Sequence, residues 1–119
     1  ELHDKIYTVM FVNKQLNSYN NFFAMGDYSA ALDSLIKGLS RYDKYIALAR
    51  QLGIHTDLDY VRKQIMAELQ KVYGVSEREA LELMEMTDKQ EYSERIYSIV
   101  SKLDTKSLEA DREKDELVP

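Results

Sequence analysis

The residues best suited to chemistry in this sequence are its two histidines, His3 and His55. His55 is followed by Asp57 and Asp59, and an imidazole with two carboxylates is a set that can bind a metal ion. Three ligands from one loop and one helix start rarely complete a coordination shell. The aspartates are also typical of a helix N-terminus, where negative charge offsets the positive end of the dipole. We therefore predict no metal site.

Other residue types that support catalysis are missing or form no pattern. The chain of 119 residues contains no Cys, so it has no thiol nucleophile, no disulfide and no cysteine zinc site. It has no glycine-rich loop for phosphates, and its carboxylates alternate with Lys and Arg as they do on solvated helix faces. The sequence therefore predicts a protein that is not an enzyme and that binds no cofactor.

A DNA-binding helix-turn-helix is the alternative function that the sequence offers. Residues 74–86, from Gly74 to Met86, place Ala80 and Leu83 where such a motif needs buried side chains. The helix that would contact DNA carries one basic residue, Arg78, against four glutamates: Glu77, Glu79, Glu82 and Glu85. Carboxylates repel the phosphate backbone, and the whole chain has a net charge of -5. We therefore predict no nucleic-acid partner and keep a transcription regulator only as the alternative.

The elements that carry these residues are predicted to be helices. The only Pro is the last residue, Pro119, so nothing interrupts a helix within the chain. The hydrophobic fraction of 45% is typical of a folded domain. No stretch reaches the ~18 uncharged apolar residues that a membrane-spanning helix needs. The composition therefore indicates an all-α domain without a membrane span.

Two long helices are predicted from stripes of apolar residues three or four positions apart. The first stripe covers residues 2–25 and consists of Leu2, Ile6, Val9, Val12, Leu16, Tyr19 and Phe23. The second follows the break at Gly26 and Asp27, and it consists of Tyr28, Leu32, Leu35, Leu39, Tyr42, Ile46 and Ala49. Each helix would be about 36 Å long. We expect an elongated molecule built on a long antiparallel helical hairpin.

Three shorter helices are predicted after Gly53, packed at one end of the hairpin. The third helix starts at Thr56 or Asp57 and ends at Gly74. A capping box at residues 76–79 starts a helix over 77–86, and the same device at residues 87–90 starts one over 88–103. Residues 1–103 would form a single domain. Residues 104–119 contain six acids and three bases, and we expect a charged tail, disordered or a fraying helix.

One segment resembles a known family. From Met25 to Gly38 the sequence is similar to the turn and second helix of a tetratricopeptide repeat (TPR), with family positions occupied by Gly26, Tyr28, Ala31 and Leu35. The resemblance covers one unit, about residues 10–43, and no second copy follows at about 34 residues. In that family the first helix of each unit lines a concave peptide-binding surface. The resemblance implies that Asn13 and Asn20 contact a partner's backbone there.

The first helix is apolar on a second side as well. Beside its main stripe it carries five large apolar side chains: Tyr7, Met10, Phe11, Phe22 and Met25. A helix that is apolar on two sides needs two neighbours. The second neighbour would be the last helices of the chain, another copy of it in a homodimer, or a segment outside this sequence. We predict a partner-binding surface at these residues together with the two asparagines.

The functional prediction is a non-catalytic protein–protein interaction or scaffold module, with a protein or peptide, or a second copy of the chain, as its partner. Because the sequence begins with Glu1 and not with Met, we expect it to be the soluble part of a larger bacterial protein, cytoplasmic or anchored to a membrane.

Overall fold

The computed structural model describes residues 2–53 and 59–111. Within those ranges it consists of helices and contains no strand, which confirms the predicted all-α class. The helices are α1 (Leu2–Ala24), α2 (Tyr28–Gln51), α3 (Asp59–Tyr73), α4 (Glu77–Glu85), α5 (Lys89–Val100) and α6 (Thr105–Asp111). The molecule measures 45 × 32 × 19 Å along its principal axes and is thus elongated, as expected.

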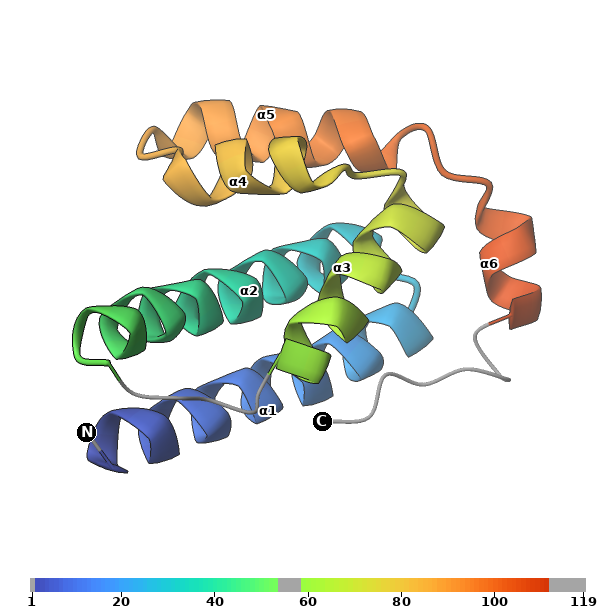
Figure 1. The fold of residues 1–119 in the computed structure, drawn as a ribbon. Coiled ribbons are helices and arrows are strands. Elements are labelled where there is room, and N and C mark those ends of the chain that lie inside the picture. Colours follow the sequence, from blue (N-terminus) through green and yellow to red (C-terminus); the bar gives the residue numbers. More distant parts are fainter. Residues whose placement is uncertain (1, 54–58, 112–119) are drawn as a thin grey trace.

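The long antiparallel hairpin is formed by α1 and α2, which lie side by side (Figure 1). Gly26 permits the tight turn between them because its φ of 78° is strained for any residue with a Cβ. Asp27 is the N-cap of α2, and its carboxylate accepts a hydrogen bond from the Ala30 N–H at 3.1 Å. The predicted turn chemistry is therefore confirmed, and it brings the first half of α1 beside the last half of α2.

The core forms around α2, which contacts α1, α3, α4 and α5. All seven residues of its predicted stripe are buried. The pair α4–α5 lies along α2 and not at the end of the hairpin, where the sequence predicted the shorter helices (Figure 1). The reason is that α2 buries a second side as well, through residues such as Ile36, which no single stripe shows.

The ends of the shorter helices follow local signals. Gly74 ends α3 with a φ of 64°, and the Ser76 hydroxyl caps α4 by accepting from the Glu79 N–H at 3.1 Å. The cap of α5 is Asp88 and not Thr87, because the Asp88 carboxylate accepts from the backbone N–H groups of Gln90 and Glu91. The predicted start of α3 at Thr56 or Asp57 lies outside the described residues.

Part of the predicted tail is helical. The short helix α6 makes a fourth shorter helix where three were expected, and Leu108 packs half-buried against the core. The Asp104 carboxylate accepts from the Ser107 N–H at 3.3 Å and so supports the start of α6. The sequence did not predict α6 because a helix of seven residues with one apolar contact shows no repeating apolar pattern. Residues 112–119 lie outside the described part of the chain.

The stripe of α1 is buried only from Val12 onward, and Val9 before it is half-buried. Val12, Leu16, Tyr19 and Phe23 are buried as predicted, whereas Ile6 is 48% exposed. The prediction was wrong for Ile6 because the first turns of α1 have few neighbours in the described structure. This end of α1 is where exposed apolar side chains gather.

Candidate functional site

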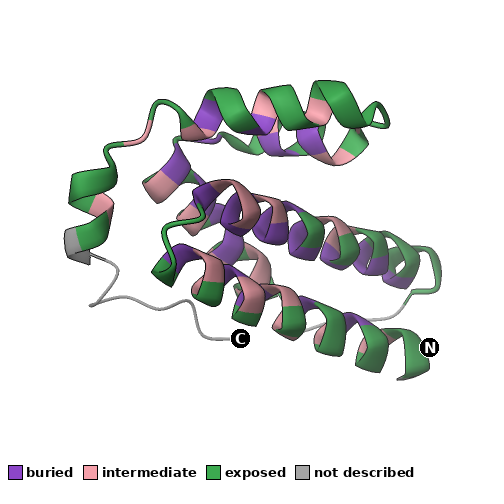
Figure 2. Ribbon diagram, turned by 180° about the vertical axis from the view of Figure 1, so that it is seen from behind, coloured by how far each residue is buried: buried purple, intermediate pink, exposed green. Residues whose placement is uncertain are grey.

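Four large apolar side chains stand exposed on the first turns of α1, and we call them the α1 patch: Ile6, Tyr7, Met10 and Phe11. They are exposed by 48, 65, 64 and 38%, respectively. Their spacing of three and four residues makes them neighbours on the helix surface. Figure 2 shows this exposed end of α1 beside the N-terminus. A cluster of this kind is a candidate contact surface, because scattered single residues are what a free surface usually exposes.

The α1 patch lies on the face of the hairpin that is turned away from α3. The Tyr19 hydroxyl donates a hydrogen bond to the Glu68 carboxylate on α3, so Tyr19 marks the side of α1 that faces α3. At about 100° per residue, Tyr7 is about a third of a turn and Met10 about half a turn away from Tyr19. Helix α3 therefore does not cover these two side chains.

One side of α2 belongs to the same face of the hairpin. Gly38 marks the line of contact between the helices, because a Cβ on Gly38 would lie 3.5 Å from the Cβ of Gln15. Going around each helix from this line, Phe11 on α1 and Arg41 on α2 are reached by turning in the same direction. Tyr19 and Tyr42, which bond to α3, are reached by turning in the opposite direction. In an antiparallel helix pair, residues that are reached by turning in the same direction from the contact line lie on the same face of the pair. Arg41 therefore lies on the face that carries the α1 patch.

This side of α2 is basic. Lys37, Arg41 and Lys44, which we call the basic stripe, follow one another at steps of four and three residues, and Leu48 continues the row with 37% exposure. Lys37 forms an ion pair with Asp33 at 2.9 Å. Arg41 and Lys44 are exposed and have no ion pair among the described residues. We call the α1 patch, the basic stripe and Leu48 together the back face of the hairpin.

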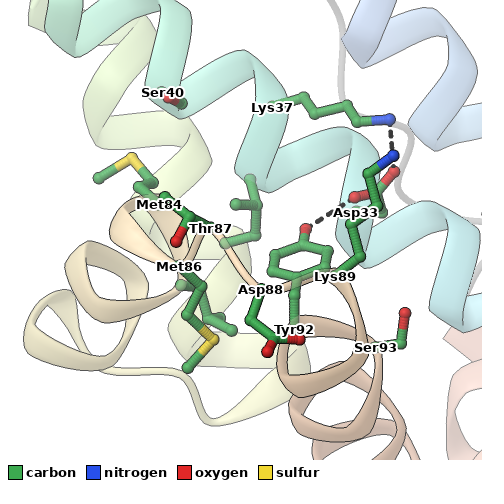
Figure 3. Close-up of a pocket in the computed structure, with 12 residues that line it drawn as sticks. Asp33, Lys37, Ser40, Met84, Met86, Thr87, Asp88, Lys89, Tyr92 and Ser93 are labelled. Atoms are coloured by element: carbon green, nitrogen blue, oxygen red, sulfur yellow. Dashed lines mark hydrogen bonds and ion pairs between the residues drawn. The ribbon is translucent and has the colours of Figure 1, made fainter.

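A groove of about 490 Å³ runs between α2 and the α4–α5 pair, and we call it the Met groove (Figure 3). Its apolar lining consists of Ile36, Leu83, Met84, Met86 and the ring of Tyr92. Methionine side chains adapt to irregular partners, so such a lining suits an apolar side chain more than a reacting group.

The polar groups of the Met groove are paired with one another. The Tyr92 hydroxyl donates to the Asp33 carboxylate at 2.7 Å, and the Lys37 ammonium lies 2.9 Å from the same carboxylate. Burial raises the pKa of Tyr92 well above its usual value, and the Asp33 carboxylate raises it further. Tyr92 is therefore a neutral hydrogen-bond donor near pH 7. Its bond ties α5 to α2.

The tyrosines of the hairpin lie in the core. Four of them are each at most 7% exposed: Tyr19, Tyr28, Tyr42 and Tyr45. Burial raises the pKa of Tyr19, and the Glu68 carboxylate adds to the effect. These side chains join the helices and are closed to a partner.

Only part of the predicted partner-binding set comes together. Tyr7, Met10 and Phe11 share the α1 patch. Met25 is 73% exposed, but it lies 15 residues beyond Met10, about 22 Å along the helix axis. Phe22 is partly buried and packs against the core. The helical stripe in the sequence did not distinguish these positions, because it does not show where α1 lacks a neighbour.

Asn13 and Asn20, expected on a peptide-binding surface, do not join the α1 patch. Asn13 is partly buried and lines a small cavity of about 120 Å³ between α1, α2 and α3, together with Thr8 and Tyr60. Asn20 is also partly buried. Both lie on the flank of α1 that is far from Phe11. Ile6, seven residues before Asn13, forms the edge of the α1 patch on this flank, so neither asparagine joins Tyr7, Met10 and Phe11.

The glutamates of α4 are held by arginines of its neighbours. Arg62 of α3 joins Asp43 at 2.9 Å and Glu77 at 3.0 Å, and the Asp43 hydrogen bond raises the pKa of the guanidinium. Arg95 of α5 contacts Glu82 at 3.0 Å. Helix α4 is the one that the alternative function would place against DNA. Two of its glutamates are thus already engaged in ion pairs with α3 and α5.

The described part of the chain offers neither a metal-binding cluster nor a membrane-spanning helix. Across residues 2–53 and 59–111 no group of three or more His, Asp or Glu side chains is placed to hold a metal ion. His3 is exposed, and His55 and Asp57 lie outside the described residues. None of the described helices is both long and apolar enough to cross a bilayer.

No protein-family model, curated protein or solved structure matches the chain. The TPR resemblance stays a prediction.

The basic stripe and the Met groove were not predicted. The stripe has a sequence signal, since Lys37, Arg41 and Lys44 alternate with the apolar stripe of α2 at helical spacing. The Met groove has none, because it depends on how the α4–α5 pair packs along α2.

Proposed function

We propose that this chain is a non-catalytic protein–protein interaction module, and that it binds its partner through the back face of the hairpin. The observation that carries the proposal is the α1 patch. Burying its exposed apolar area against a partner would contribute about 25 cal/mol for each Å² removed from water. The patch lies on a helix of 23 residues that packs against one of 24 residues, so the surface is already helical and little order has to be created on binding.

The composition of the back face supports the proposal. Aromatic residues, Met and Arg are enriched in protein interfaces, and the back face carries Tyr7, Met10, Phe11 and Arg41. The Met groove supports a non-catalytic role, because its tyrosine and carboxylate are bonded to each other and stabilise the packing of α5 on α2.

We further propose that the α1–α2 hairpin is a single unit of TPR type. Small residues allow the close approach that this family uses: Ala31 is fully buried, and Gly38 lies where α1, α2 and α3 meet. The unit acts as the scaffold that presents the back face.

The function is tested by affinity capture with matched variants. The immobilised full chain is compared with the double variant Tyr7→Glu/Met10→Glu in an extract of the native host. Tyr97→Glu is the control, because Tyr97 on α5 is exposed by 71%, close to the 65% of Tyr7. Circular dichroism checks that all three chains are folded. We expect at least one protein, identified by mass spectrometry, to be retained by the wild type and by Tyr97→Glu but lost by the double variant.

The proposal fails if every retained protein binds the double variant as strongly as the wild type. It also fails if the retained proteins are lost equally with Tyr97→Glu, because the loss would then follow from added charge anywhere on the surface.

A further inference from the structure

The back face combines two chemistries in one surface. On α1 it offers exposed aromatic and aliphatic side chains, and on α2 it offers cations. We infer that the partner segment docked there is acidic as well as apolar, with apolar anchors on the α1 patch and carboxylates facing Arg41 and Lys44. The inference rests on the proposed function, because it names the chemistry of the partner that the function requires.

The cations of the stripe are available to a partner. Arg41 and Lys44 are exposed, and neither has an acidic neighbour within ion-pair distance in the described part of the chain. By contrast, Arg62 and Arg95 are joined to glutamates of α4. Because an Arg presents a planar fork of donors, Arg41 suits a bidentate contact with a carboxylate.

The acids near the back face lie at its edges. Asp33 is occupied by Lys37 and Tyr92. Asp4 precedes the α1 patch by one helical turn and is exposed. The cationic part of the face is therefore the α2 side, and an acidic partner would align its carboxylates with α2.

The charge of the whole molecule sharpens this choice. The net charge is -5, and residues 77–100, which include α4 and α5, contain seven acids and three bases. An acidic segment is repelled by that side and attracted by the basic stripe. Complementary potentials of this kind orient a partner and raise its association rate.

The alternative occupants fit less well. A second copy whose twofold axis passed through the basic stripe would place Arg41 and Lys44 against the same residues of its neighbour, which is repulsive. A nucleic acid would leave the α1 patch in contact with phosphates. From Lys37 to Leu48 the row is about 16 Å long, which matches three turns of a helix. The surface thus fits a short acidic amphipathic helix.

A displayed library of random peptides of about 16 residues, which spans the row, tests the inference. The library is selected on the full wild-type chain. Enriched peptides are then measured against Tyr7→Glu/Met10→Glu, against Arg41→Glu/Lys44→Glu and against the control Lys102→Glu/Lys106→Glu. We expect enriched peptides with net negative charge and several apolar residues. Their affinity should fall at least about tenfold with each back-face variant and little with the control.

The outcomes separate the two proposals. Enriched peptides that depend on Tyr7 and Met10 but are neutral or basic, or that ignore Arg41→Glu/Lys44→Glu, overturn the acidic partner and leave the proposed function intact. Peptides that ignore every back-face variant overturn both. If light scattering shows that the wild type is a dimer and that Tyr7→Glu/Met10→Glu is a monomer, the face binds a second copy and the inference is overturned. If a duplex oligonucleotide binds, and its binding depends on Arg41 and Lys44 but not on Tyr7, the inference of an acidic partner is also overturned.

Discussion

Several tyrosines of this protein keep their hydroxyl groups protonated because those groups are buried. Burial is the main cause of a raised pKa at Tyr19, Tyr42, Tyr73 and Tyr92. For three of them a carboxylate adds to the effect, because the hydroxyl donates to Glu68, Asp59 or Asp33. In the unfolded chain these hydroxyls would ionise at about pH 10. Their protonation is therefore linked to folding.

This linkage predicts unfolding at alkaline pH. Below about pH 10 both states keep the tyrosine protons, so the contribution of these tyrosines to stability does not change with pH. Above it the unfolded state releases protons that the folded state still holds, so each tyrosine removes about 1.4 kcal/mol of stability per pH unit. Urea unfolding between neutral pH and about pH 11, with tyrosinate absorbance as a second signal, measures the slope.

The variant Tyr92→Phe provides the check on that prediction. It removes one raised pKa and one hydrogen bond, so the slope above about pH 10 should be smaller and the stability at neutral pH lower by about 1 kcal/mol. An identical slope in wild type and variant, or a stability that does not change over the whole range, would contradict the linkage.

At the scale of the elements, α2 is the helix around which the others pack. Its stripe, from Tyr28 to Ala49, was predictable because every apolar step of three or four residues is buried. Gly26 and Gly74 were predictable as breaks, and both have a positive φ. The exposure of Ile6 and the helix α6 were not, because they depend on which neighbours happen to reach those segments.

Gly38 gives a prediction about this packing. A Cβ added there would lie 3.5 Å from the Cβ of Gln15 and 4.0 Å from a methyl group of Ile65, which are ordinary contacts. Ala is a better helix former than Gly, so Gly38→Ala should stabilise the chain by about 0.5–1 kcal/mol. Gly38→Leu, the control, should destabilise it, because the larger side chain has no space between α1 and α3.

Thermal and urea unfolding followed by circular dichroism measure both variants. If Gly38→Ala were as destabilising as Gly38→Leu, α1 and α2 would have to be closer than the structure places them.

At the scale of the whole molecule, the surface is divided by charge. The α4–α5 side is acidic, and its glutamates engage Arg62 and Arg95, whereas the back face of the hairpin is basic and apolar. The partner-binding role of Tyr7, Met10 and Phe11 was predicted from the second apolar side of α1. The basic stripe beside them required the antiparallel alignment of α2, which fixes which residues share a face. The function we propose at this scale is the docking of a partner on one side of the helical hairpin.

Hydrogen exchange of the full chain tests this central claim most directly, with and without the tightest-binding peptide selected on the wild type. We predict slower exchange in residues 6–11 of α1 and 41–48 of α2 when the peptide is bound, because a docked partner suppresses local opening of the helices it covers. Residues 84–93, around the Met groove, should be unchanged. Slower exchange at residues 84–93 with no change in α1 would contradict the account and move the binding site to the Met groove.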